Sequence, residues 1–260
     1  MKYYRPYHLV DSSPWPFLGG CSGLSLVVGG IFYMHYGYIW LMILGILFVG
    51  IIMVVWWRDV IRESTFLGKH NTIVKRGIKY GMILFIVSEI MLFFSLFWAF
   101  FHNSLSFAVE LGGCWVPRGV EALDYKAVPL LNTALLLGSG MLVTWAHYGI
   151  IRGWRVVGLR ALGGGVALGL LFTCLQGFEY YVASFTIADS VYGSVFYLMT
   201  GAHGLHVIIG SVFLTVCWFR LLYYQFRDDD PVGFELAAWY WHFVDVVWLF
   251  LYIFVYCWGS

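Results

Sequence analysis

Residues 81–98 read GMILFIVSEIMLFFSLFW, an apolar run that contains one ionisable side chain, Glu89. An apolar run of this length is typical of a helix that crosses a lipid bilayer. A charged group near its centre costs roughly 2.5–3.5 kcal/mol on insertion scales. The run therefore predicts a functional or assembly site inside a membrane protein. We expect Glu89 to be protonated at neutral pH, because desolvation disfavours the carboxylate.

The composition of the whole chain supports membrane insertion. Of its 260 residues, 61% are hydrophobic and only 11% are charged, whereas soluble domains carry about 25% charged residues. The net charge of +1 excludes the basic field that nucleic-acid binding requires. The five cysteines contain no CxxC pair, and we interpret them as small buried apolar residues. The first residues lack the apolar core of a signal peptide, so we expect insertion through the chain's own helices.

Apolar stretches of about 20 residues, the length of a membrane-spanning helix, recur along the chain. We predict about seven spans, at residues 15–36, 38–57, 77–102, 128–151, 159–185, 191–223 and 234–258. With this topology, all but two of the 15 Lys and Arg residues lie on the N-terminal side, the exceptions being Arg118 and Lys126. The positive-inside rule then places the N-terminus in the cytoplasm or the mitochondrial matrix.

Few polar side chains lie within the predicted spans, and they are the candidate functional residues: Glu89, His147, Glu179, His203, His206, His242 and Asp245. His203 and His206 share a helix face at i, i+3 spacing. With His242 or His147 they could form a metal or haem site. Histidines that form hydrogen bonds between helices are the commoner case, and no cysteine or carboxylate accompanies this pair.

His242 and Asp245 repeat the i, i+3 spacing with an acid, so that each could satisfy the other's buried polar group. Helix–helix packing is the simpler interpretation of this pair, and proton transfer is the alternative. Glu179 lies near the end of its span and is expected to be hydrogen-bonded. Because no P-loop, GxSxG, HExxH or dinucleotide motif occurs, the pattern favours either a non-catalytic subunit of a larger complex or a simple proton channel.

Several blocks resemble subunit III of the haem–copper cytochrome c oxidases, mitochondrial type, and they span essentially the whole chain. They are HLVDSSPWP (8–16), WWRDVIRE (56–63), ILFIVSE (83–89), PLLNT (129–133), TWAH (144–147), FTIAD (185–189), GLHVIIG (204–210) and WYWHFVDVVWLF (239–250). The resemblance implies an all-α membrane fold with a helix pair (1–72) and a five-helix bundle (73–260). The pair would splay from the bundle and leave a V-shaped, lipid-filled cleft.

The resemblance also implies a role. The chain would be a non-redox subunit that stabilises subunit I, holds phospholipids and supports proton uptake, with haem and copper on partner subunits and no catalytic residue or metal of its own. Glu89 matches the family's buried, carbodiimide-reactive carboxylate. Positions that match lipid contacts are Trp57, Glu63, His70 and Arg220.

The expected location is the mitochondrial inner membrane, with the N-terminus in the matrix and the C-terminus in the intermembrane space. A bacterial plasma membrane is the alternative. Two other functions remain open from the sequence: subunit III of a quinol-type oxidase, and a stand-alone proton channel. The loops at residues 152–165 and 227–231 depart from the family's usual sequence.

Overall fold

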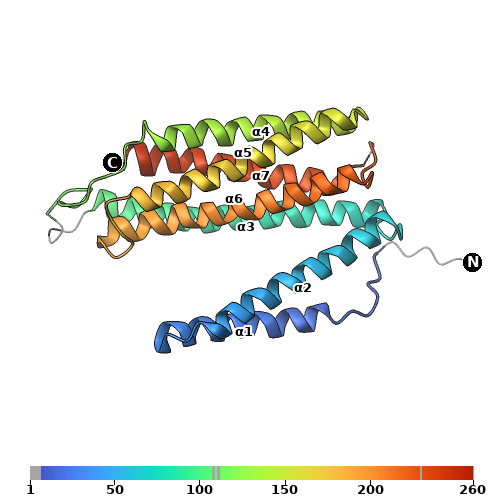
Figure 1. The fold of residues 1–260 in the computed structure, drawn as a ribbon, viewed down its shortest axis with the longest axis horizontal. Helices are drawn as coiled ribbons and strands as arrows, with labels where there is room; N and C mark the ends of the chain where they lie inside the picture. Colours follow the sequence, from blue (N-terminus) through green and yellow to red (C-terminus); the bar gives the residue numbers. More distant parts are fainter. Residues whose placement is uncertain (1–6, 107–108, 110–111, 229, 260) are drawn as a thin grey trace, which may run out of the picture. The chain divides into compact units, whose positions relative to one another are not determined.

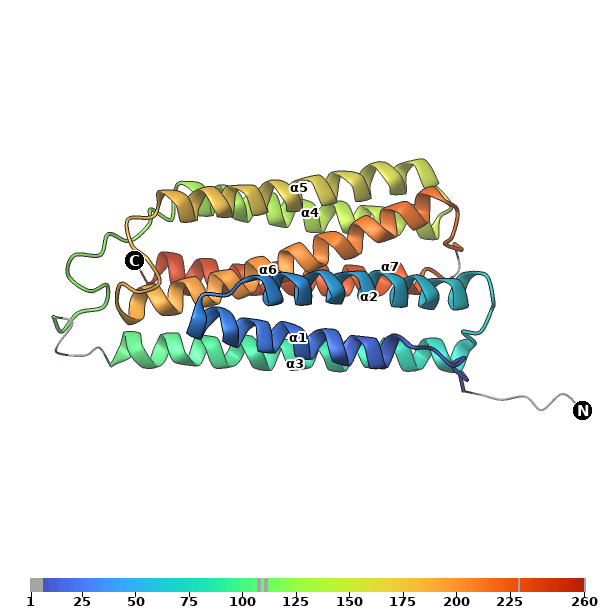
Figure 2. The same cartoon turned by 60° about the horizontal axis from the view of Figure 1, so that its bottom comes forward.

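The computed structural model describes residues 7–106, 109, 112–228 and 230–259. These residues form helices and no β-strand. Seven helices are long and apolar enough to cross a membrane, which confirms the predicted all-α membrane fold. They are labelled in Figures 1 and 2 as α1 (Trp15–Tyr36), α2 (Trp40–Thr65), α3 (Thr72–Leu105), α4 (Val128–Ile151), α5 (Arg155–Val182), α6 (Ser190–Leu222) and α7 (Val232–Leu251). Of the basic residues used for the topology, Lys2 and Arg5 lie outside the described residues.

The helices often extend beyond the predicted spans. Two predicted spans, 15–36 and 128–151, coincide with α1 and α4, but α2 continues to Thr65 and α3 begins at Thr72. The apolar pattern ends where charged residues begin, whereas Arg and Glu are good helix formers and prolong the helix. A π-helical turn, Tyr252–Cys257, follows α7 and completes the last span.

The chain divides into two compact units, Met1–Ile78 and Lys79–Ser260. The division falls within α3, a few residues after the predicted boundary at residues 72 and 73. The N-terminal unit contains the hairpin of α1 and α2, and the C-terminal unit contains the bundle of α4–α7 with most of α3.

The α1–α2 hairpin (Figure 1) depends on glycines that let the two backbones approach closely. The turn is made by Gly37, which has φ +68° and donates its N–H to the Tyr33 carbonyl at 2.9 Å. Farther along, a Cβ at Gly29 would lie 2.5 Å from the Met42 backbone nitrogen, and one at Gly45 would lie 2.6 Å from Leu26 Cα. At these two positions of the interface only glycine fits.

The core of the bundle is centred on α7, which buries more of its span than any other described helix. Trp241 shows how it packs, because a Cβ at Gly169 of α5 would lie 2.7 Å from its ring and one at Gly210 of α6 would lie 2.8 Å from it. The indole therefore fits into a gap that two glycines leave between α5 and α6. Trp248 on the same helix is also fully buried and packs edge-to-face on Phe172, with ring centroids 4.8 Å apart.

We expect Gly29→Ala to destabilise the hairpin by roughly 1–3 kcal/mol, because the added methyl group overlaps the α2 backbone. Gly30→Ala is the matched control: a Cβ there meets nothing within 4 Å, and alanine favours the helix by up to about 1 kcal/mol. Thermal unfolding of the full-length chain in detergent measures both. Equal melting temperatures for the two variants would contradict close packing at Gly29.

Candidate functional site in the transmembrane bundle

Glu89 has a partner across the bundle. Its Oε2 lies 2.8 Å from Nε2 of His206, so the contact joins α3 to α6 over 117 residues of sequence. This partner lies on another helix, so the residues near Glu89 in sequence do not reveal it. The side chains are 18% and 10% exposed, respectively.

The hydrogen bonds of His206 locate a proton between the two groups. Nδ1 of His206 lies 2.7 Å from the Ala202 carbonyl oxygen, and a carbonyl can only accept, so Nδ1 carries a hydrogen. In the neutral imidazole Nε2 is then an acceptor, and the 2.8 Å contact requires a proton from Glu89. If that proton moves to Nε2, the pair becomes carboxylate and imidazolium. Both arrangements are neutral overall, which suits an apolar environment.

Aromatic rings enclose this pair. Phe93, one turn after Glu89 on α3, packs edge-on to the His206 imidazole with centroids 5.1 Å apart. Tyr240 of α7 stacks on the same imidazole at 6.3 Å. The rings limit the number of water molecules that could solvate either group, so the hydrogen bond to His206 is the main polar interaction of the Glu89 side chain.

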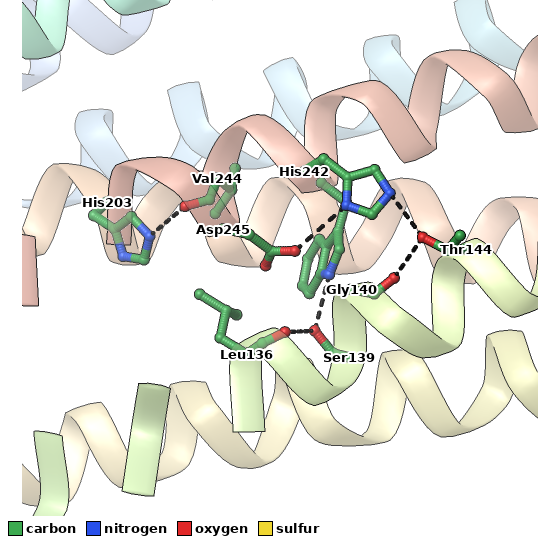
Figure 3. Close-up of polar contacts among 9 residues, drawn as sticks. Leu136, Ser139, Gly140, Thr144, His203, His242, Val244 and Asp245 are labelled. Carbon is green, nitrogen blue, oxygen red and sulfur yellow. Dashed lines mark hydrogen bonds and ion pairs between the residues drawn. The ribbon is translucent and has the colours of Figure 1, made fainter. Parts of the chain in front are cut away.

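A second polar group joins α4 to α7 (Figure 3). The Oδ2 of Asp245 lies 3.6 Å from Nδ1 of His242, one turn earlier on α7. The other ring nitrogen of His242 lies 3.3 Å from the Thr144 hydroxyl, which donates to the Gly140 carbonyl at 3.0 Å. The four residues line a pocket of about 440 Å³ together with Leu137, Met141, Val246 and Leu249.

Gly140 is required at this site, because a Cβ there would lie 2.3 Å from Asp245 Oδ2. The carboxyl group therefore lies against the α4 backbone. Its Oδ1 is buried and accepts no hydrogen bond from the described residues. The Trp241 indole donates to Ser139 Oγ at 2.9 Å and forms a second link between α4 and α7.

His203 and His206 contact different helices. Nε2 of His203 donates to the Val244 carbonyl at 3.2 Å, and its ring packs on Phe172 and Trp248. His206 instead faces Glu89. The metal or haem site considered from their spacing is therefore not assembled, and neither His242 nor His147 joins them in a group with metal-ligand spacing among the described residues.

Glu179, in the last turn of α5, belongs to a buried chain of hydrogen bonds. The Tyr256 hydroxyl donates to Glu179 Oε1 at 2.7 Å and accepts from the Gln176 amide at 3.3 Å. Asn132 of α4 donates to Gln176 at 3.5 Å. Tyr256 was not singled out from the sequence, and only its position one π-helical turn beyond α7 brings it to α5.

The remaining candidates lie apart from these sites. The His147 ring packs on Phe234 at 5.6 Å, and its Nε2 is buried without a hydrogen-bond partner among the described residues. Trp57 is exposed on α2. The guanidinium of Arg220 lies 4.4 Å from the Phe226 ring centroid, and the residue is half-buried.

Glu63 and His70, both in the N-terminal unit, lie close to each other and to His8, which the sequence analysis did not single out. Thr144, which contacts His242, was missed in the same way. The sequence offered one signal for both residues, since each lies within a block of the family resemblance, HLVDSSPWP and TWAH.

Comparisons with known proteins give a consistent result. The family model described as "Cytochrome c oxidase subunit III" matches residues 5–260. The chain is 57% identical over 256 residues to cytochrome c oxidase subunit 3 of Branchiostoma lanceolatum, with 98% of both chains covered. It is 54% identical to the protein of that name from Scyliorhinus canicula, again with 98% of both chains covered. The corresponding protein of Arabidopsis thaliana is 55% identical, and the match covers 98% of this chain and 97% of the relative.

We expect Glu89→Gln to change the free energy of unfolding by less than about 1 kcal/mol, because the amide N–H can donate to His206 Nε2 as the protonated acid does. Glu89→Leu leaves that nitrogen buried without a partner and should cost about 1–3 kcal/mol. Thermal unfolding in detergent measures both. Equal destabilisation by the two variants would mean that the proton resides on His206. Infrared spectra offer a separate check: the carboxylic-acid band should be absent from Glu89→Gln.

Proposed function

The chain belongs to the cytochrome c oxidase subunit III family, and on that premise we propose that it stabilises the oxidase's catalytic subunit I, retains structural phospholipids and supports proton uptake. Membership makes it a multi-pass membrane subunit of the complex that reduces oxygen and pumps protons, with other oxidase subunits as partners. In this family haem and copper belong to other subunits. The relatives' names favour the cytochrome c oxidase over the quinol-type alternative and over a stand-alone channel.

One observation carries the proposal: ionisable groups within the bundle contact one another in separate pairs and do not converge on a common centre. Glu89 pairs with His206, and His242 contacts Asp245. Such pairs fix helices in register and hold protons, whereas a redox centre needs several ligands directed at one point. A structural role beside the redox subunits is therefore the function that the geometry favours.

The outward apolar surface supports a role in assembly. On α3, large side chains such as Leu84, Phe94 and Trp98 are 59–70% exposed. Apolar area of this extent must be covered by acyl chains or by a neighbouring subunit. We assign this cover to subunit I and to lipids, which agrees with the expected stabilising role.

Proton uptake is assigned to the Glu89–His206 pair. A proton can pass between Oε2 and Nε2 over 2.8 Å without changing the charge of the pair. A proton gained from water, in contrast, would give an imidazolium beside a neutral acid. The pair can thus hold or relay a proton, and the neutral resting form keeps the cost of burial low.

We place the subunit in the mitochondrial inner membrane with its N-terminus in the matrix. The asymmetry of Lys and Arg between the two sides supports this orientation. Headgroup contacts are assigned to Trp57, Glu63, His70 and Arg220, since indole and guanidinium groups suit the phosphate region. The lipid-filled cleft implied by the family resemblance stays a prediction.

Oxidase depleted of this subunit should reduce oxygen at a near-normal initial rate and then lose activity several-fold sooner during turnover. The redox groups lie on other subunits, whereas the lost cover exposes apolar surface. An oxygen electrode records both the initial rate and its decay, and adding the purified chain back should restore the lifetime. Immediate loss of oxygen reduction would argue against a stabilising role, as would an unchanged lifetime.

Trp57→Ala and Arg220→Ala should each lower the phospholipid retained by the purified oxidase after detergent washing. Trp40→Ala is the control, because Trp40 is similarly exposed but lies at the other end of α2. Native mass spectrometry counts the lipids per complex. The headgroup assignment fails if both variants retain as much lipid as Trp40→Ala.

A further inference from the structure

Two histidines and a glutamate converge in the N-terminal unit, outside the membrane-spanning bundle. His8, Glu63 and His70 each offer a ligand atom, and these atoms all lie within 4.8 Å of one another. Nε2 of His8 lies 3.0 Å from Glu63 Oε2. The two imidazole rings meet edge-to-face with centroids 5.4 Å apart. The residues come from three segments: the stretch before α1, the last turns of α2, and the α2–α3 connection.

The cluster is held in place by interactions of neighbouring residues. The Trp15 indole donates to Asp59 Oδ2 at 2.7 Å, which anchors the start of α1 on α2. Asp11 forms an ion pair with Lys69, next to His70. The Lys69 N–H donates to the Glu63 carbonyl at 3.1 Å and turns the connection back toward α2. The three ligands are therefore brought together before any ion binds.

We propose that His8, Glu63 and His70 form a binding site for a divalent transition-metal cation of the Zn²⁺ class. Two imidazole nitrogens and one carboxylate oxygen are a known zinc ligand set with one open position. Tetrahedral ligands at 2.0–2.2 Å from zinc are about 3.4 Å apart. The His8–Glu63 pair is close to that spacing at 3.0 Å, and the three ligand atoms all lie within 4.8 Å of one another. Oxygen-preferring cations such as Mg²⁺ and Ca²⁺ are disfavoured by the imidazoles.

The charges suit a cation. Burial lowers the pKa of His70, repulsion from His8 and then from Lys75 lowers it further, and Glu63 partly opposes them. This direction favours the neutral imidazole, which is the form that binds metals. Glu63 supplies the negative charge. All three side chains are only partly buried, which leaves a path for the ion.

A bound cation would also resolve a conflict of charge. The resemblance places Glu63 among lipid contacts, yet a carboxylate and a lipid phosphate repel each other unless a cation lies between them. The metal would at the same time crosslink the segment before α1 to the α2–α3 connection. The inference does not rest on the oxidase role, because it depends only on residues of the N-terminal unit.

The test uses the full-length chain in detergent, stripped with a chelator and titrated with ZnCl₂ by isothermal calorimetry. We expect one zinc ion per chain, with the affinity reduced at least about tenfold in each of His8→Gln, Glu63→Gln and His70→Gln. His35→Gln is the control, because His35 is an exposed histidine of the same unit outside the cluster, and it should bind zinc normally. Circular dichroism verifies that the variants keep their helices.

X-ray absorption at the zinc edge identifies the ligands, with scattering from two imidazoles expected in the wild type and from one in His70→Gln. The proposal is overturned if the wild type binds no zinc that survives desalting, or if the three variants bind it as tightly as His35→Gln does. Phospholipid phosphorus is measured on the same samples. A loss of lipid in His70→Gln without any change in zinc binding would make the cluster a headgroup site instead.

Discussion

The hydrogen bond between Glu89 and His206 places α3 within the bundle. Hydrocarbon offers no water to an exposed polar group, so each such group must find its partner inside the protein. The pair meets this constraint with one proton for two titratable side chains, and it stays neutral wherever that proton resides. Sliding α3 by one residue would move Glu89 away from His206 and leave that Nε2 without its partner. The bond therefore specifies the register of α3 as well as satisfying two groups.

The same constraint explains why the intramembrane polar residues lie between helices. Thr144 meets His242 between α4 and α7, and Tyr256 meets Glu179 between the end of the chain and α5. Each contact joins segments far apart in sequence. In a membrane every helix presents an apolar surface, so apolar packing alone specifies poorly which helices meet. Polar contacts such as these provide that specificity. Glycines add to this specificity. Because Gly140 has no side chain, the Asp245 carboxyl can lie against the α4 backbone.

Much of the fold could be predicted from the sequence. Apolar runs give the seven spans because their length is set by the bilayer, and two spans are correct to the residue. Helix ends beyond the apolar region are less predictable: α2 continues past Arg58 and Asp59, where hydropathy falls but helix propensity does not. The free-energy cost of a charged group in an apolar helix indicated that Glu89 is important. The sequence did not identify the residue that Glu89 contacts. Periodicity defines the face on which a side chain lies, and it does not identify the helix packed against that face.

His203 and His206 illustrate the limit of spacing arguments. Three residues turn a helix through about 300°, so two side chains at this spacing diverge by about 60°. On a surface helix that angle still permits a shared ligand. Inside a bundle it is enough to direct His203 at α7 and His206 at α3. His8, Glu63 and His70 show the opposite case: their spacing in sequence has no pattern, yet their ligand atoms lie close together in the structure. Their convergence follows from a chain that turns back on itself after α2, a contact that only the tertiary structure reveals.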